Sequence, residues 1–168
     1  SGDQWQTVNI DTHETTWSSV DVSPDGKQLV FDMLGDLYTV DIEGGEAWPL
    51  TQGIDWNFQP RFSPNGKEIA FISDRKEGDN LWVINADGSA LRQVTQETEH
   101  NLHNPYWTPD GQWIAARKGY VSARSLPAGS IWLYHSHGGE KTRGGLLSVD
   151  RLHGEESQKK IAEPAFSP

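Results

Sequence analysis

A recurring turn tetrapeptide constrains the fold of this chain more than any other feature of the sequence. It reads Ser23-Pro24-Asp25-Gly26, then Ser63-Pro64-Asn65-Gly66, then Thr108-Pro109-Asp110-Gly111, and its first two residues return as Ser167-Pro168. Proline presets φ for a turn and glycine supplies positive φ, so each copy predicts a tight hairpin. The prolines of the first three copies, Pro24, Pro64 and Pro109, are 40 and 45 residues apart, a spacing typical of propeller blades.

Two short apolar runs follow each tetrapeptide at matching positions, and the second run has an aromatic residue in its second place. A glycine turn comes next, and the first two copies then close alike with Thr51 and Thr95. Short apolar runs between turn signals predict strands, here four per repeat. Tyr38, Trp82 and Trp132 share one strand position, and we expect them to pack between blades. The runs are 29–31 and 37–40, 69–72 and 81–84, and 113–116 and 131–134.

The repeats predict an all-β fold, a β-propeller fragment with about three four-stranded blades plus terminal strands. Three blades are too few to close a ring, so two hydrophobic blade faces would lie open. We expect the fragment to self-associate as a homodimer, two three-blade halves making a six-bladed ring. The expected segments are 1–16, an N-terminal strand segment; 17–53, 54–98 and 99–158, blades one to three; and 159–168, the start of a truncated fourth repeat.

Composition narrows the range of partners. The 168 residues are 35% hydrophobic and include 8 Trp, which is enough to bury a core. A net charge of −10 with scattered Lys and Arg argues against nucleic acid and anionic membranes, because both need a clustered basic surface. The chain has no Cys and no apolar run long enough for a membrane span.

Connection lengths predict which face of the propeller binds. The link between the second and third strands grows from repeat to repeat, whereas the turn after the third strand stays constant. In a meander these two kinds of connection lie at opposite ends of the strands, and insertions gathered on one face commonly mark the binding face. The segments at the variable face are 33–36, 52–56, 74–80, 96–104 and 118–130, and the candidate residues are Asp36, Asp55, Trp56, Asp74, Arg75, His100, His103 and Arg124.

The repeat resembles the TolB-type β-propeller repeat over roughly residues 11–168. The second copy carries its pattern almost throughout, from Phe62-Ser63-Pro64-Asn65-Gly66 through Leu81-Trp82-Val83 to Val94-Thr95. The stretches 21–38, 113–118 and 125–135 are similar to the N-terminal propeller of periplasmic amidohydrolases that carry a TolB-like domain ahead of a metal-dependent hydrolase domain. This resemblance implies a periplasmic or otherwise exported protein. Thr108, Asn65 and the segment 142–148 depart from the pattern.

Histidines are the only metal-ligand candidates, and we assign none of them to a metal. His135-Ser136-His137 has the spacing of two ligands on one strand face, but it lies at the constant-turn end. His13, His100, His103 and His153 fall on the variable face, where four imidazoles would have to converge from separate loops.

Acidic residues also have a structural interpretation that we prefer. Asp74-Arg75 looks like a catalytic pair, yet in TolB-like repeats this dipeptide orders a loop. Asp25, Asp87 and Asp110 suit turns, where their side chains accept backbone hydrogens. The chain lacks Gly-x-Ser-x-Gly, and it has no phosphate-binding glycine loop. No catalytic residue and no cofactor are therefore expected.

The sequence thus predicts a non-catalytic module for binding, gating or protein interaction, excised from a larger exported amidohydrolase. Its partner would be a protein or peptide, or the remainder of its own chain. Two alternatives remain open. One is a stand-alone TolB-like interaction scaffold of the cell envelope, and the other is the filter propeller of a serine peptidase.

Overall fold

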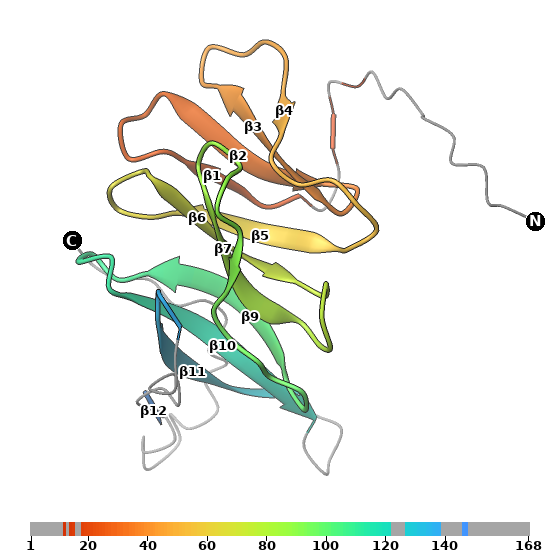
Figure 1. The fold of residues 1–168 in the computed structure, drawn as a ribbon, viewed down its shortest axis with the longest axis vertical. Coiled ribbons are helices and arrows are strands. Elements are labelled where there is room, and N and C mark those ends of the chain that lie inside the picture. Colours follow the sequence, from red (N-terminus) through yellow and green to blue (C-terminus); the bar gives the residue numbers. More distant parts are fainter. Residues whose placement is uncertain (1–11, 13, 16–17, 122–126, 139–145, 148–168) are drawn as a thin grey trace, which may run out of the picture.

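The computed structural model describes residues 12, 14–15, 18–121, 127–138 and 146–147, which form twelve strands in three four-stranded antiparallel sheets (Figure 1). None of these residues lies in a helix. The predicted all-β propeller fragment with four-stranded repeats is confirmed. The expected N-terminal strand segment at 1–16, apart from residues 12 and 14–15, and the truncated fourth repeat lie outside the described residues.

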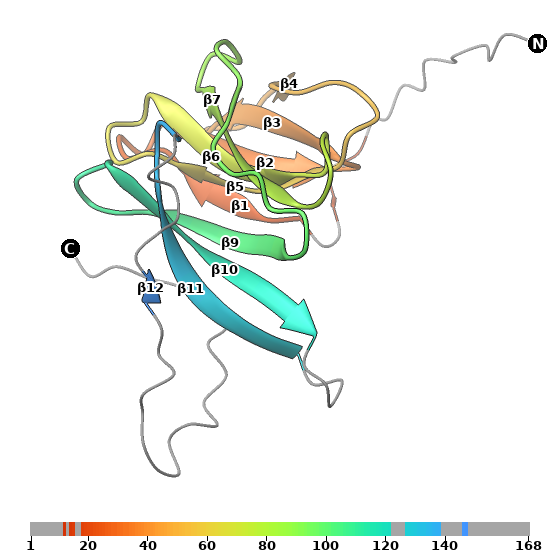
Figure 2. The same ribbon diagram turned by 60° about the horizontal axis from the view of Figure 1, so that its bottom comes forward.

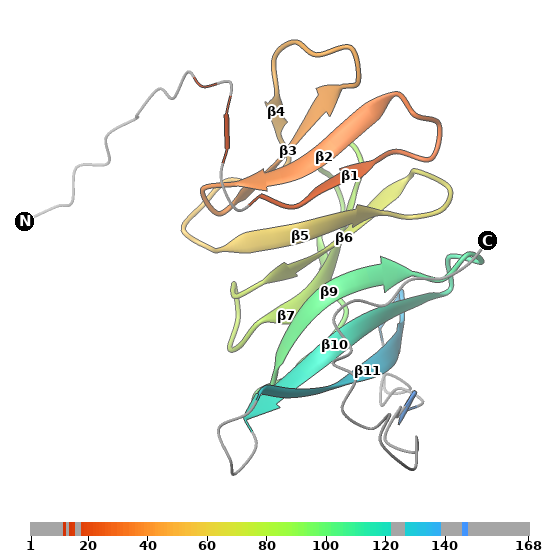
Figure 3. The same ribbon diagram turned by 180° about the vertical axis from the view of Figure 1, so that it is seen from behind.

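Each sheet is a meander in chain order, and the three sheets stack one on the next. The first strands of the sheets, β1, β5 and β9, lie side by side along one flank of the stack (Figures 1 and 3). The first sheet is β1 (Val20–Val22), β2 (Gln28–Met33), β3 (Asp36–Asp41) and β4 (Trp48–Pro49). The second is β5 (Asn57–Phe62), β6 (Glu68–Ser73), β7 (Asn80–Asn85) and β8 (Arg92–Gln93). The third is β9 (Asn101–Trp107), β10 (Trp113–Val121), β11 (Pro127–His135) and β12 (Leu146–Leu147).

The turn tetrapeptides form the predicted hairpins. In the second sheet, the Gly66 amide donates to the Ser63 carbonyl at 2.8 Å, and the Ser63 hydroxyl accepts from the Glu68 amide at 3.0 Å. Gly66 has φ of 69°, a left-handed value that other residues rarely adopt. The Asp25, Asp87 and Asp110 carboxylates each accept a backbone amide two residues on, as predicted for turn residues.

Two hydrophobic cores fill the spaces between the sheets. Trp82 lies in the core between the first and second sheets, and Trp132 packs against the core between the second and third. Tyr38 stacks on Phe31, 5.7 Å between ring centroids, on the opposite side of its sheet from buried Leu37. Among the described residues Tyr38 therefore does not pack between sheets. The first core is Val30, Leu37, Phe62, Ile69, Phe71, Trp82 and Ile84; the second is Ala70, Ile72, Leu81, Val83, Val94, Leu102, Trp107, Ile114, Ala116 and Tyr134.

The expected loop at 118–130 is wrong in large part, because β10 and β11 pair as far as Val121 and Pro127. Figure 2 shows them as a long curved hairpin. Gly119 and Gly129 face each other in the ladder, and a Cβ at Gly119 would lie 3.6 Å from the Asn101 carbonyl oxygen. That distance is an ordinary van der Waals contact, so the pairing with β9 and β11, and not a close approach of the backbone, keeps this glycine in a strand. Similarly, the expected loop 96–104 ends early, because β9 begins at Asn101.

A threonine latch closes the first two sheets and explains their shared Thr ending. The Thr51 hydroxyl accepts from the Leu37 amide and donates to the Asp36 carboxylate, each at 2.9 Å. In the second sheet the Thr95 hydroxyl accepts from the Leu81 amide at 2.9 Å and donates to the Asn80 side chain at 2.8 Å. Each latch ties the end of a sheet to the start of its third strand.

We predict that Thr95→Val lowers the free energy of unfolding by about 1–3 kcal/mol, because it keeps the side-chain shape but leaves the buried Leu81 amide and Asn80 oxygen without this partner. Urea denaturation measures the change. Thr98→Val, an exposed substitution on the same segment, is the control and should change stability by about 0.5 kcal/mol or less. Equal effects of the two substitutions would contradict the latch.

Candidate functional site

The β2–β3 and β6–β7 connections and the links between sheets lie at one end of the sheet stack, and the turn tetrapeptides lie at the other (Figures 1 and 3). We call the first the loop end; it comprises residues 33–36, 51–57, 74–80 and 96–101. The arrangement follows from the meander, because the β2–β3 and β6–β7 turns and the links between sheets all leave the strands on the same side.

Five of the eight predicted residues meet where the first two sheets adjoin at the loop end. The Asp74 carboxylate accepts the Trp56 amide at 2.7 Å, which fixes the 74–79 loop to the link between sheets. The Trp56 ring lies over Gly35, where an added Cβ would be 3.0 Å from a ring carbon. Asp36 and Asp55 interact electrostatically with Arg75. The cluster is therefore assembled from three separate connections.

Arg75 is anchored rather than mobile at the surface. Its guanidinium donates to the Asn57 side chain at 2.6 Å and to the Ser73 hydroxyl at 3.0 Å, and it lies 5.0 Å from the Trp82 ring centroid. Partial burial lowers the Arg75 pKa, while Asp55, Asp36 and Asp74 raise it. Burial also raises the Asp36 pKa, against the hydrogen bond from Thr51 and the charge of Arg75. The Asp74-Arg75 dipeptide thus makes loop-ordering contacts.

Three exposed apolar side chains, which we call the apolar patch, lie on the connections that form this cluster. The sequence analysis named Trp56 among its candidate residues and covered the other two only through the segments 33–36 and 52–56. Leu34, Ile54 and Trp56 are 68%, 86% and 56% exposed. Leu34 and Gly35 form the two-residue β2–β3 turn with φ of 54° and 89°. Positive φ at both positions is the signature of a type I′ turn, which favours Asn-Gly. Leucine in this conformation costs on the order of 1–3 kcal/mol, so a Leu-Gly hairpin tip was the available sequence signal.

His100 lies in the link between the second and third sheets, and His103 lies on β9. The His103 side chain is half-buried, with its ring centroid 6.3 Å from that of Phe58. Burial lowers the His103 pKa and raises that of Asp79, and each opposes the shift of the other by charge. Within the described part of the chain, no three His, Asp or Glu side chains form a metal-binding group. Arg124, His13 and His153 lie outside the described residues.

A polar brace that the sequence analysis missed joins β2, β5 and β9. The Asp32 carboxylate accepts the Ser19 amide at 2.7 Å and the Gln59 amide at 2.6 Å, joining the first two sheets. The Gln59 side chain in turn exchanges two hydrogen bonds with Asn104, at 2.6 and 2.7 Å. Gln59 and Asn104 have φ of 56° and 53°. These residues occupy equivalent positions, four before each tetrapeptide. They kink β5 and β9, and the kinks let the sheets form hydrogen bonds with one another near the shared flank.

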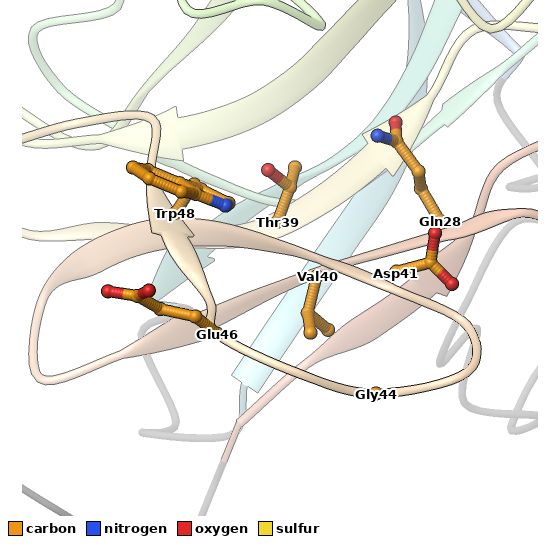
Figure 4. Close-up of a pocket in the computed structure, with 7 residues that line it drawn as sticks. All are labelled: Gln28, Thr39, Val40, Asp41, Gly44, Glu46 and Trp48. Carbon is orange, nitrogen blue, oxygen red and sulfur yellow. The ribbon is translucent and has the colours of Figure 1, made fainter.

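Two shallow hollows lie on the surface that the described residues form. One, of about 470 Å³, lies on the second sheet at the loop end and is lined by residues including Lys76, Asn80 and Glu97. The other, of about 360 Å³, lies beside the β3–β4 turn (Figure 4). There the exposed Trp48 ring stands near Thr39, with the Glu46 and Asp41 carboxylates to either side. Both linings mix charged and amide groups, without the convergent apolar walls typical of small-molecule sites.

Three four-stranded meanders stacked about adjoining inner strands define a β-propeller architecture. The chain belongs to the family of tricorn protease N-terminal β-propeller domains, whose model matches residues 15–162. The solved structure of a putative TolB from Agrobacterium tumefaciens covers 80% of this chain and 50% of its own, at 25% identity and a TM-score of 0.66. The predicted TolB-like propeller is thereby confirmed.

The chain is similar to part of an uncharacterised protein and to part of a peptidase. An uncharacterised protein of Agrobacterium fabrum is 31% identical over 112 residues, 64% of this chain and 36% of the relative. The uncharacterised peptidase YuxL of Bacillus subtilis is 34% identical over 104 residues, 55% of this chain and 16% of the peptidase. The chain therefore spans well under half the length of either relative. Among the described residues there is no helix with the length and hydropathy that a bilayer crossing requires.

We predict that His103 titrates below its ordinary pKa of 6.5, because its half-buried ring resists protonation. The unfolded chain then binds the proton first, so the free energy of unfolding should fall between about pH 7.5 and about pH 5.5. An NMR titration of the imidazole proton measures the pKa directly.

Asp79→Asn is the matched variant, because removing its carboxylate takes away the charge that raises the His103 pKa. The His103 pKa should fall further in this variant. A His103 pKa at or above 6.5, or no response to Asp79→Asn, would contradict this account of the His103 pKa.

Proposed function

We propose that this chain is a non-catalytic TolB-like β-propeller module that binds a protein or peptide through its loop end, as part of a larger exported hydrolase. The observation that carries the proposal is the exposed cluster at the loop end, where Leu34, Ile54 and Trp56 adjoin charged groups. Exposed apolar side chains rimmed by polar groups commonly mark protein-binding sites. Trp and Arg are also the residues most enriched at binding hot spots.

The order of the loop end supports recognition. The link carrying Trp56 is fixed by Asp74, and Arg75 is held from below by Asn57, Ser73 and the Trp82 ring. A surface ordered before binding loses less conformational entropy when a partner docks. This preorganisation suits selective binding or gating.

The parent protein is proposed on two grounds. Resemblance of the stretches 21–38, 113–118 and 125–135 favours an amidohydrolase of the periplasm, with the propeller ahead of the hydrolase domain. A peptidase parent is the second candidate, and it is favoured by the match to YuxL, of which this chain covers 16%. In either parent the loop end would select or admit what reaches the hydrolase domain. A stand-alone envelope scaffold remains the third candidate.

Self-association is proposed from the outer face of the first sheet. Val20, Phe31 and Tyr38 form one cross-strand row on that face, and Val22, Leu29 and Val40 form the next. Val20 and Val22 are exposed there. In a propeller this face packs on a neighbouring blade, so a second copy of the chain would bury it.

We predict that the chain sediments as a dimer at two different protein concentrations, both in the micromolar range. Val20→Lys should sediment as a monomer, because it places a charge beside the Phe31–Tyr38 stack. Ile42→Lys is the control, because Ile42 is similarly exposed but lies at the β3–β4 turn. A monomeric wild-type chain would contradict the homodimer.

We predict for the binding function that a displayed peptide library panned on the chain yields binders that Trp56→Ala weakens by about tenfold or more. Trp48→Ala is the matched control, because Trp48 is 66% exposed but lies on the outer strand β4. Binders that tolerate Trp56→Ala but not Trp48→Ala would place recognition elsewhere, and the absence of binders would contradict the proposed function.

A further inference from the structure

The strained hairpin tip points to the kind of partner that the loop end receives. Leu34 occupies a left-handed position in which Asn would be comfortable, and its side chain is 68% exposed. Neither the stability of the turn nor the packing of a core explains leucine there. An apolar side chain kept at a conformational cost, in water, next to Trp56 over Gly35, is explained by a contact with another molecule.

The charge around this apolar patch is negative. Asp36, Asp55 and Asp74 all interact with Arg75, and Asp74 also accepts the Trp56 amide, so three carboxylates surround one guanidinium there. Arg75 is itself committed to Asn57 and Ser73 and lies over the Trp82 ring. The patch therefore offers an apolar surface bordered by carboxylates.

We infer that Leu34, Ile54 and Trp56 receive an apolar side chain of a partner protein that carries a Lys or Arg beside it in an exposed segment. This inference rests on the proposed function, because it names the partner class for the same loop end. The apolar side chain covers the patch, and the cation meets the carboxylates of Asp36 and Asp55. Charge complementarity of this kind selects partners and adds a salt-dependent component to binding.

Four fluorescent peptides of equal length test the inference by polarisation on the intact chain. The first carries a Leu-Phe pair flanked by Lys, the second the same pair flanked by Glu, the third the pair with uncharged flanks, and the fourth Ser-Ser flanked by Lys. The first should bind about tenfold tighter than the second, and high salt should weaken it. The fourth should not bind, because it lacks the apolar pair.

Leu34→Asn gives a signature that a structural role for Leu34 would not produce. It should weaken the first peptide by about tenfold, while raising Tm by a few degrees because Asn-Gly suits the turn. Ile42→Asn makes the same change at another exposed residue and should leave peptide binding unaltered. Trp56→Ala is the second variant, and it should also weaken the first peptide.

The outcomes separate the inference from the proposed function. If Leu34→Asn leaves binding unchanged, or the Glu-flanked peptide binds as well as the Lys-flanked one, the inference is overturned, while library binders sensitive to Trp56→Ala would still support the proposed function. If neither the four peptides nor the library binds at the loop end, both are overturned. If Leu34→Asn instead dissolves the dimer in sedimentation, the patch is covered by a second copy and the inference is overturned.

Discussion

Face-to-face packing of twisted sheets is the constraint on which the rest of this structure depends. Strand residues alternate between the two faces of a sheet, and in the middle sheet both faces are apolar. Leu81 enters the core shared with the third sheet, and its neighbour Trp82 enters the core shared with the first. A sheet of this kind has no water-facing side, so its stability comes from its neighbours. Stacking of repeats therefore follows from strand periodicity.

The polar brace shows how the stack is held in register. Apolar cores resist separation of the sheets but do little to fix their rotation about one another, because hydrophobic contact is not directional. The Asp32 carboxylate and the paired Gln59 and Asn104 side chains supply directional bonds between sheets. Their geometry needs backbone amides that point sideways out of the strand, and the left-handed φ values of Gln59 and Asn104 provide them. Strain at two residues is thus offset by hydrogen bonds across two junctions.

Local chemistry made most of the fold predictable from sequence. Pro-Asp-Gly turns act through φ preferences of three or four neighbouring residues, so the hairpins and the four-strand repeats could be predicted without tertiary information. The β10–β11 extension could not, because Gly119 and Gly129 read as loop residues. Lys118 of that hairpin forms a 2.6 Å ion pair with Glu97, which lies outside the hairpin, and it also lies over the Trp132 ring of β11. The polar brace was missed because Asp32 and Gln59 are 27 residues apart.

The candidate site, like the fold, could be predicted from the sequence only in part. The end chosen from connection lengths brings Asp36, Asp55, Trp56, Asp74 and Arg75 together, although the β3–β4 and β7–β8 connections at the opposite end are as long as the β6–β7 connection. The sequence analysis included Leu34 only as part of the segment 33–36 and did not use Leu34-Gly35 as a hairpin signal. Only the backbone shows that Leu34 is the first residue of a left-handed turn, and only the side-chain exposure shows that no core receives it.

The two ends of the sheets therefore follow different physical rules. At the tetrapeptide end, side-chain oxygens such as that of Ser63 bond to backbone amides within five residues, so each turn satisfies itself and its sequence repeats. At the loop end, the groups that order one connection come from another, as Asp74 does for Trp56. At the loop end, a residue that contacts a partner can be substituted without disrupting the hydrogen bonds of a hairpin turn. This freedom explains how a repeat with fixed hairpins can carry a loop end that tolerates a strained leucine, and why binding is better sought there than at the self-contained turns.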